Sequence, residues 1–182
     1  MDLFKNTRLK IARAVLKKRA ARSNRKMVYN NFTRVKTIGI VWDASKQNEF
    51  QALSGFHQRM MERNIDVKII GYYEGKNLPD QYTALRYLTC FRKPEINLLH
   101  IPDSTDIKSF INNKFDILID INFEKLFFLA YITTLSKASL KAGLYDADDT
   151  DASFDFMMEI KKPVNINDYL NQVIQYLEMI NS

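Results

Sequence analysis

The sequence predicts an α/β fold: a single three-layer, Rossmann-like sandwich with a mostly parallel sheet, preceded by a basic N-terminal helix. From residue 37 onward, short apolar segments rich in β-branched residues alternate with segments of helical period. Such alternation is typical of parallel sheets that helices cover on both faces. The 182 residues, 46% of them apolar, are enough for one globular domain with an appendage.

The predicted strands are short apolar runs bounded by turn or cap residues. The run at 115–121 is the strongest, and it follows earlier strands at 37–42 and 66–71. Further extended segments are predicted at 87–91, 96–101, 140–144 and 154–160. Right-handed crossovers between such strands give the expected doubly wound topology.

Four helices are predicted between these strands. They cover residues 48–63, 106–113, 123–135 and 166–180. Asn122 precedes the third helix and is a predicted N-cap. The fourth is the clearest, because its apolar residues recur at intervals of three and four, as in a core-facing stripe.

The charge of the chain is strongly asymmetric. Residues 1–36 carry twelve basic side chains and one acid, a net charge of +11, and the rest carries −5, which together give +6. We therefore predict two parts, a basic helical arm at 1–36 and an α/β domain at 37–182. We also expect the domain to fold without the first thirty residues, because the arm has little apolar surface.

The arm is predicted to be helical from about residue 3 to 22, with only a narrow apolar stripe. A basic segment of this kind either docks on the acidic domain or contacts a polyanion, which is an anionic membrane surface or nucleic acid. No RNP, zinc-finger or helix-turn-helix signature accompanies it. The residues predicted to contact a polyanion are Lys10, Arg13, Lys17, Lys18, Arg22 and Arg25.

Composition also restricts the compartment and the class of protein. One cysteine excludes an intrachain disulfide and favours a reducing compartment. The longest strongly apolar run, 126–132, is too short for a transmembrane segment, and the charged first thirty residues contain no secretory signal. We therefore expect a cytoplasmic protein, which the arm can hold at the periphery of the inner membrane.

No cofactor or metal is expected. The five glycines form neither a dinucleotide-binding loop nor a P-loop, and no nucleophile elbow is present. The acidic loop at 146–151 departs from the calcium-binding EF-hand pattern at Asp151 and Met157. His57, His100 and Cys90 are interpreted as packed or solvated structural residues.

Polar residues follow two predicted strands at their carboxyl ends. Asp43 and Ser45 follow the first strand, and Asp120 and Asn122 follow the strongest one. Ligands of open α/β sheets bind at this edge, so these four residues are a candidate ligand site. The simpler interpretation is that they cap the following helices.

The segments FDILID (115–120), NFE (122–124), YI (131–132), LSKA (135–138) and KAG (141–143), with IGI at 38–40 and DAS at 43–45, form a characteristic set. Together with the basic N-terminal helix, the set resembles a domain-of-unknown-function family of Bacteroidota bacteria, which implies no established activity. About thirty residues also resemble the N-terminal half of heptosyltransferase-type GT-B glycosyltransferases. That likeness implies a Rossmann-like half-domain, and the chain is too short to hold the second domain that such enzymes need.

Three functional hypotheses follow from the sequence. The first is a non-enzymatic binding module whose basic arm contacts an anionic surface or partner, and the missing cofactor loops favour it. The second is a small-molecule or sugar-related enzyme or sensor derived from a GT-B-like half-domain. The third is a nucleic-acid-associated protein that uses the arm.

Overall fold

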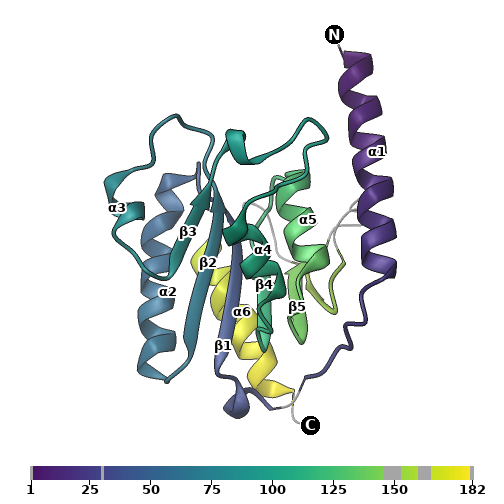
Figure 1. Ribbon diagram of the computed structural model, residues 1–182. Helices are drawn as coiled ribbons and strands as arrows, with labels where there is room; N and C mark the ends of the chain where they lie inside the picture. The colour runs from purple at the N-terminus through teal and green to yellow at the C-terminus, as the bar shows by residue number, and fades with distance from the viewer. Residues whose placement is uncertain (1, 30, 146–152, 160–164, 181–182) are drawn as a thin grey trace.

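Six parallel strands form one sheet in the order β3-β2-β1-β4-β5-β6 (Figure 1). The computed structural model describes residues 2–29, 31–145, 153–159 and 165–180. The strands are β1 (Thr37–Asp43), β2 (Asp66–Tyr72), β3 (Leu88–Phe91), β4 (Ile117–Asp120), β5 (Leu140–Leu144) and β6 (Phe156–Met158). The chain moves outward from β1 to β3 and then returns to β4, so the direction of winding changes between β1 and β4. The predicted α/β class and parallel sheet are confirmed.

Helices cover both faces of this sheet. The α-helices are α1 (Asp2–Ala21), α2 (Phe50–Glu62), α3 (Asp80–Thr83), α4 (Thr105–Asn112), α5 (Phe127–Leu135) and α6 (Ile166–Met179). Short 3-10 turns are η1 (Phe32–Arg34), η2 (Gln47–Glu49) and η3 (Lys93–Glu95). Helices α2 and α6 pack on one face, and α4 and α5 pack on the other.

The two faces of the sheet bury separate apolar clusters because successive strand side chains point to opposite sides. In β1, Ile38 and Ile40 face the cluster under α2 and α6. Val41 belongs to the cluster under α4 and α5, together with Leu129 and Ile132 of α5. Helix α5 is apolar on most sides because it lies between the sheet and another helix.

That other helix is α1, which stands outside α5 and forms an additional layer (Figure 1). Ala12 and Leu16 of α1 are buried against Phe127 and Tyr131 of α5. The arm therefore docks on the domain, which is one of the alternatives that the sequence left open. The face that docks carries Ala12 and Leu16, whereas Ile11 stays 47% exposed.

The segment between α1 and β1 runs along the sheet edge where the strands begin. Val28 donates a backbone hydrogen bond to Ser139 O, and the Tyr29 hydroxyl donates to Leu177 O. Phe32 and Val35 are buried in the same cluster as β1 and α6. This part of the predicted arm therefore contributes to the main core.

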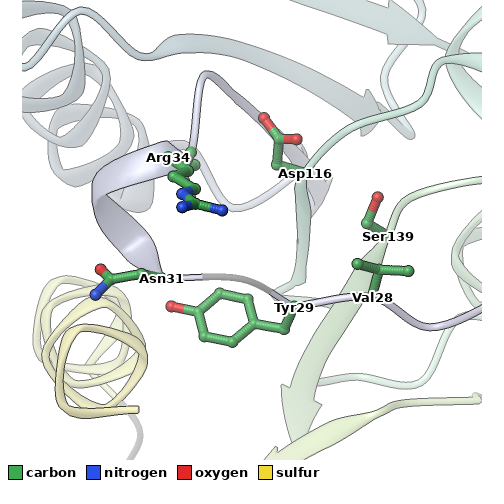
Figure 2. A pocket seen from close by; sticks show the side chains of 7 residues that line it. Val28, Tyr29, Asn31, Arg34, Asp116 and Ser139 are labelled. Atoms are coloured by element: carbon green, nitrogen blue, oxygen red, sulfur yellow. The ribbon is translucent and has the colours of Figure 1, made fainter. Parts of the chain in front are cut away.

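A small hollow of about 50 Å³ lies between this segment and the start of β4 (Figure 2). Figure 2 shows Arg34, Asp116 and Ser139 around it. The Asp116 carboxylate accepts hydrogen bonds from the backbone N–H groups of Lys36 and Thr37, each at 2.9 Å. A hollow of this size has room for little more than water, and Asp116 has a structural role in fixing the start of β1.

The segment 96–101, predicted to be extended, does not join the sheet. A single antiparallel bridge links Ile96 to Pro102, and the chain between them turns back. The Asn97 side chain accepts hydrogen bonds from Leu99 N and Ile101 N. An asparagine that bonds to nearby backbone favours a turn over a strand, which explains the wrong prediction.

Candidate functional site

Asp43 and Asp120 lie at the carboxyl edge of the sheet, beside the point where the winding reverses. Strands β1 and β4 are adjacent and parallel, and Val41 pairs with Asp120. Both carboxylates are buried, with 8% and 4% of their surface exposed. The structure therefore brings the two predicted groups to one edge, which is where ligands of doubly wound sheets bind.

Hydrogen bonds occupy the Asp120 carboxylate. One oxygen accepts from Asn122 N at 2.7 Å, and the other accepts from the Thr133 hydroxyl of α5. The Tyr169 hydroxyl of α6 donates to the backbone oxygen of Asp120 at 3.4 Å. Burial beside Asp120 raises the pKa of Tyr169 far above its ordinary value. Asp120 thus connects β4 to helices on both faces of the sheet.

Asn122 closes the loop that follows β4 instead of capping a helix at residue 123. Its side-chain oxygen accepts from Leu126 N at 2.9 Å, and its amide donates to Leu126 O at 3.0 Å. Lys125 within this loop has a positive φ of 54°. The helix consequently begins at Phe127 and not at 123, because this turn comes first. The predicted N-cap role of Asn122 is wrong.

Asp43 and Ser45 organise the turn after β1. Asp43 accepts a hydrogen bond from Ser45 N at 3.2 Å, and the Ser45 hydroxyl accepts one from Glu74 N after β2. Neither residue caps α2, because the N-cap position is Glu49 and has no side-chain hydrogen bond there. Glu49 instead accepts from the Trp42 indole at 2.9 Å, and burial raises its pKa.

An ion pair joins the loops that follow β1 and β4. Lys46 donates to Glu124 across this edge of the sheet. The hydrogen bond with Glu124 raises the pKa of Lys46, and the same bond lowers the pKa of Glu124. Lys46 is partly exposed and Glu124 is exposed, so the pair contributes little stability and can open for a ligand.

We expect Asp120→Ala to destabilise the protein by about 2 kcal/mol or more, because it leaves two buried donors, Asn122 N and the Thr133 hydroxyl, without acceptors. Asp43→Ala is the matched variant at the same edge, and it removes only the bond from Ser45 N. Urea unfolding followed by circular dichroism measures both. An equal effect of the two substitutions would contradict the structural role assigned to Asp120.

The basic residues of the arm divide into two groups. Lys10, Arg13, Lys17 and Lys18 are exposed on α1, and Arg22 is exposed in the turn directly after it. Arg25 lies beyond the helix and forms an ion pair with Asp155, and it also donates to Ala138 O at 2.6 Å. Arg25 therefore holds the start of β5 beside the chain that leads to β6.

The cysteine and His57 have packed positions, as the sequence suggested. Burial raises the pKa of Cys90 to about 12, so its thiol is not a nucleophile at neutral pH. His57 stacks on Tyr87 with ring centroids 3.7 Å apart, and desolvation lowers its pKa. Among the described residues, no group of three or more acidic, histidine or cysteine side chains is arranged to hold a metal ion. The acidic loop at 146–151 lies outside these residues.

A family model for a family of unknown function matches residues 6–180, which include both α1 and the whole sheet. The chain belongs to this family, DUF6913. A comparison with curated proteins gives no match. The match to DUF6913 begins within α1, so it covers residues 6–21 of this helix as well as the sheet. Within the described residues, no helix is both long enough and apolar enough to span a bilayer.

Sequence reasoning missed two further features of this DUF6913 chain. Lys141 of β5 is only 2% exposed, and its ammonium donates to Thr134 O at 2.6 Å. Arg19 of α1 donates to the Tyr131 hydroxyl of α5. A lysine inside an apolar strand was a visible signal for the first, whereas the second depends on how α1 docks.

Proposed function

We propose that this chain is a non-enzymatic binding module that contacts an anionic membrane surface through the outward face of α1. The observation that carries the proposal is the docking of α1 through one face. Ala12 and Leu16 are buried on α5, which fixes the helix and leaves its cationic residues toward solvent. A helix held in this way presents its charges without having to be ordered on binding.

The exposed cations follow the helical repeat. Lys10, Arg13 and Lys17 are separated by three and four residues and therefore lie on one flank of the helix. Lys18 lies on the other flank, and Arg22 follows in the turn that ends the helix, four residues later. With a rise of 1.5 Å per residue, the row from Lys10 to Arg22 is about 18 Å long.

Shape and polarity favour a membrane surface over insertion or a nucleic-acid groove. Helix α1 is the outermost layer beyond α5, so a flat surface can reach it (Figure 1). Ala12 and Leu16 are used for docking, and among the side chains of α1 that the structure describes, Ile11 is the one large apolar residue left well exposed, which is too little for insertion. The attraction is then electrostatic, at about 1 kcal/mol for each basic residue near an anionic bilayer. Arg25 is not part of this face because it pairs with Asp155.

The test is binding to vesicles that contain phosphatidylglycerol, measured by sedimentation. A variant with Lys10→Gln, Lys17→Gln and Lys18→Gln should bind about 100-fold more weakly than the wild type, because three contacts are lost. The matched control changes three exposed lysines of the domain, Lys76→Gln, Lys93→Gln and Lys114→Gln, and should bind nearly normally. Wild-type binding should also weaken steeply as salt is raised.

Equal losses in the two triple variants would overturn this proposal, because net charge alone would then explain binding. Preferential binding to RNA or DNA over vesicles would overturn it in favour of a nucleic-acid partner. Binding that high salt does not weaken would show that insertion, and not the cationic face, holds the protein.

A second candidate function is ligand binding by Asp43, Ser45, Asp120 and Asn122 at the carboxyl ends of β1 and β4. Their position where the direction of winding reverses favours it. The side chains of Asp120 and Asn122 are each tied by two internal hydrogen bonds. Those of Asp43 and Ser45 each accept one from nearby backbone, so they are the better candidates for ligand contact. The likeness to GT-B half-domains stays a prediction. A nucleotide sugar that raised the melting temperature of the wild type but not of Asp43→Ala would support this second function.

A further inference from the structure

A cavity of about 460 Å³ lies between α1, α4, α5 and the loop that precedes α4. This volume lies within the range of small-molecule sites in proteins. Each segment contributes an apolar side chain: Val15 from α1, Ile101 from the loop, Ile111 from α4 and Leu135 from α5. Val15 and Arg19 of the docked helix form one of its walls.

Charged side chains gather on one part of the lining. Arg19 of α1 donates to the Tyr131 hydroxyl, and its guanidinium lies 5.9 Å from the centre of the Tyr131 ring. Lys108 of α4 forms an ion pair with Asp103. Two cations and one acid leave a net charge of +1 among these lining residues.

We propose that this cavity binds a single-chain anionic amphiphile, a carboxylate with a medium-length aliphatic tail. The apolar walls take the tail, since burial of aliphatic surface is the main source of affinity in such a site. The carboxylate lies against Arg19, whose planar fork suits a carboxylate, and beside Lys108. A net charge of +1 matches a monoanion. The site is separate from the outward cations of α1 and does not depend on membrane binding.

Octanoate is the probe, and its neutral counterpart is octanol. We expect titration calorimetry of the full chain to show octanoate binding at one site, more tightly than octanol. Arg19→Gln should weaken octanoate about tenfold and leave octanol unchanged, because only the charged head group loses a partner.

A pair of neighbouring substitutions tests the location. Leu99 lines the cavity, whereas Leu98 does not and is 77% exposed. Leu99→Trp should narrow the cavity with a bulkier side chain and weaken both probes at least tenfold, whereas Leu98→Trp should bind both as the wild type does. Thermal unfolding of each variant shows whether it is folded, so a loss of binding can be assigned to the site.

Absence of octanoate binding to the wild type would overturn the inference. Equal affinity for octanol and octanoate would overturn the anionic class, and unchanged binding by Leu99→Trp would overturn the location. The variant with Lys10→Gln, Lys17→Gln and Lys18→Gln should bind octanoate normally. Failure of vesicle binding and failure of this site are therefore distinguishable.

Discussion

We expect a chain that lacks residues 1–36 to be unfolded, and a chain that lacks residues 1–22 to fold with reduced stability. The longer deletion removes Phe32 and Val35 from the main core, where they pack with β1 and α6. Loss of large core side chains costs about 2 to 5 kcal/mol each, and small domains have only about 5 to 15 kcal/mol in total. The ion pair of Arg25 with Asp155 and its hydrogen bond to Ala138 O are lost as well.

The shorter deletion removes only α1 and leaves the segment that holds the start of β1 and β5. It exposes Phe127 and Tyr131, which Ala12 and Leu16 now cover. We expect a loss of about 2 to 4 kcal/mol, estimated from the apolar area involved. The free energy of unfolding, from urea titration followed by circular dichroism, measures the loss.

Two point variants of the full chain test whether lost core packing, and not the shortening of the chain, lowers the stability. Phe32→Ala in the full chain should destabilise by about 3 kcal/mol or more, whereas Met27→Ala, at a position 57% exposed, should change little. Cooperative unfolding of the chain that lacks residues 1–36 would show that the domain begins at residue 37. Our proposal instead places the division close to residue 22.

The strands and their parallel arrangement were predictable because their signal is local. Runs such as 37–42 and 115–121 are rich in apolar and β-branched residues, and Asp43 and Asn122 follow them. The position of Asp43 and Asp120 at one edge also follows from topology alone. A parallel strand always brings its carboxyl end to the same side of the sheet.

The docking of α1 was not predictable from its own pattern. Two weak apolar faces compete on this helix, one with Ile11 and one with Ala12 and Leu16. The second face is buried because it meets Tyr131, a partner more than a hundred residues away in the chain. The roles of Arg19 and Arg25 depend on the same distant contacts, and a helical wheel contains no information about them.

For the polar residues at the carboxyl ends of β1 and β4, the sequence predicted that they form local hydrogen bonds but not which partners they have. Asp and Asn after a strand favour local bonds to backbone N–H groups, and both Asp43 and Asp120 make one. Which group forms each further hydrogen bond with these side chains depends on packing. Thr133 reaches Asp120 because α5 crosses that edge, and Asn122 bonds to Leu126 because the loop turns back before α5.

Lys141→Met should remove a rise in stability with pH that the wild type shows between about pH 8 and pH 10.5. Desolvation in β5, aided by the nearby Arg25, lowers the pKa of Lys141 from 10.5 to about 8, and Asp155 opposes the shift. Between these values the unfolded chain holds a proton that the folded protein has released. Stability therefore increases with pH in this window, by about 3 kcal/mol in total.

The measurement is the free energy of unfolding of both proteins at pH 7 and pH 10.5. Cys90 and Tyr82 have pKa values raised to about 12, so they destabilise the folded state as pH rises above 9. Both groups are present in each protein, and the difference between wild type and variant isolates Lys141. The bond from Lys141 to Thr134 O is lost in the variant at every pH, so that loss adds a constant offset and no slope.

Lys137→Met is the control, because Lys137 is exposed and near Lys141 in the chain. Its curve should run parallel to that of the wild type across the whole range. If Lys141→Met also ran parallel to the wild type, the buried ammonium would have to keep its proton in the folded state up to an ordinary pKa. Burial at 2% exposure makes that outcome costly, because the ammonium loses most of its hydration there and the bond to Thr134 O replaces only part of it.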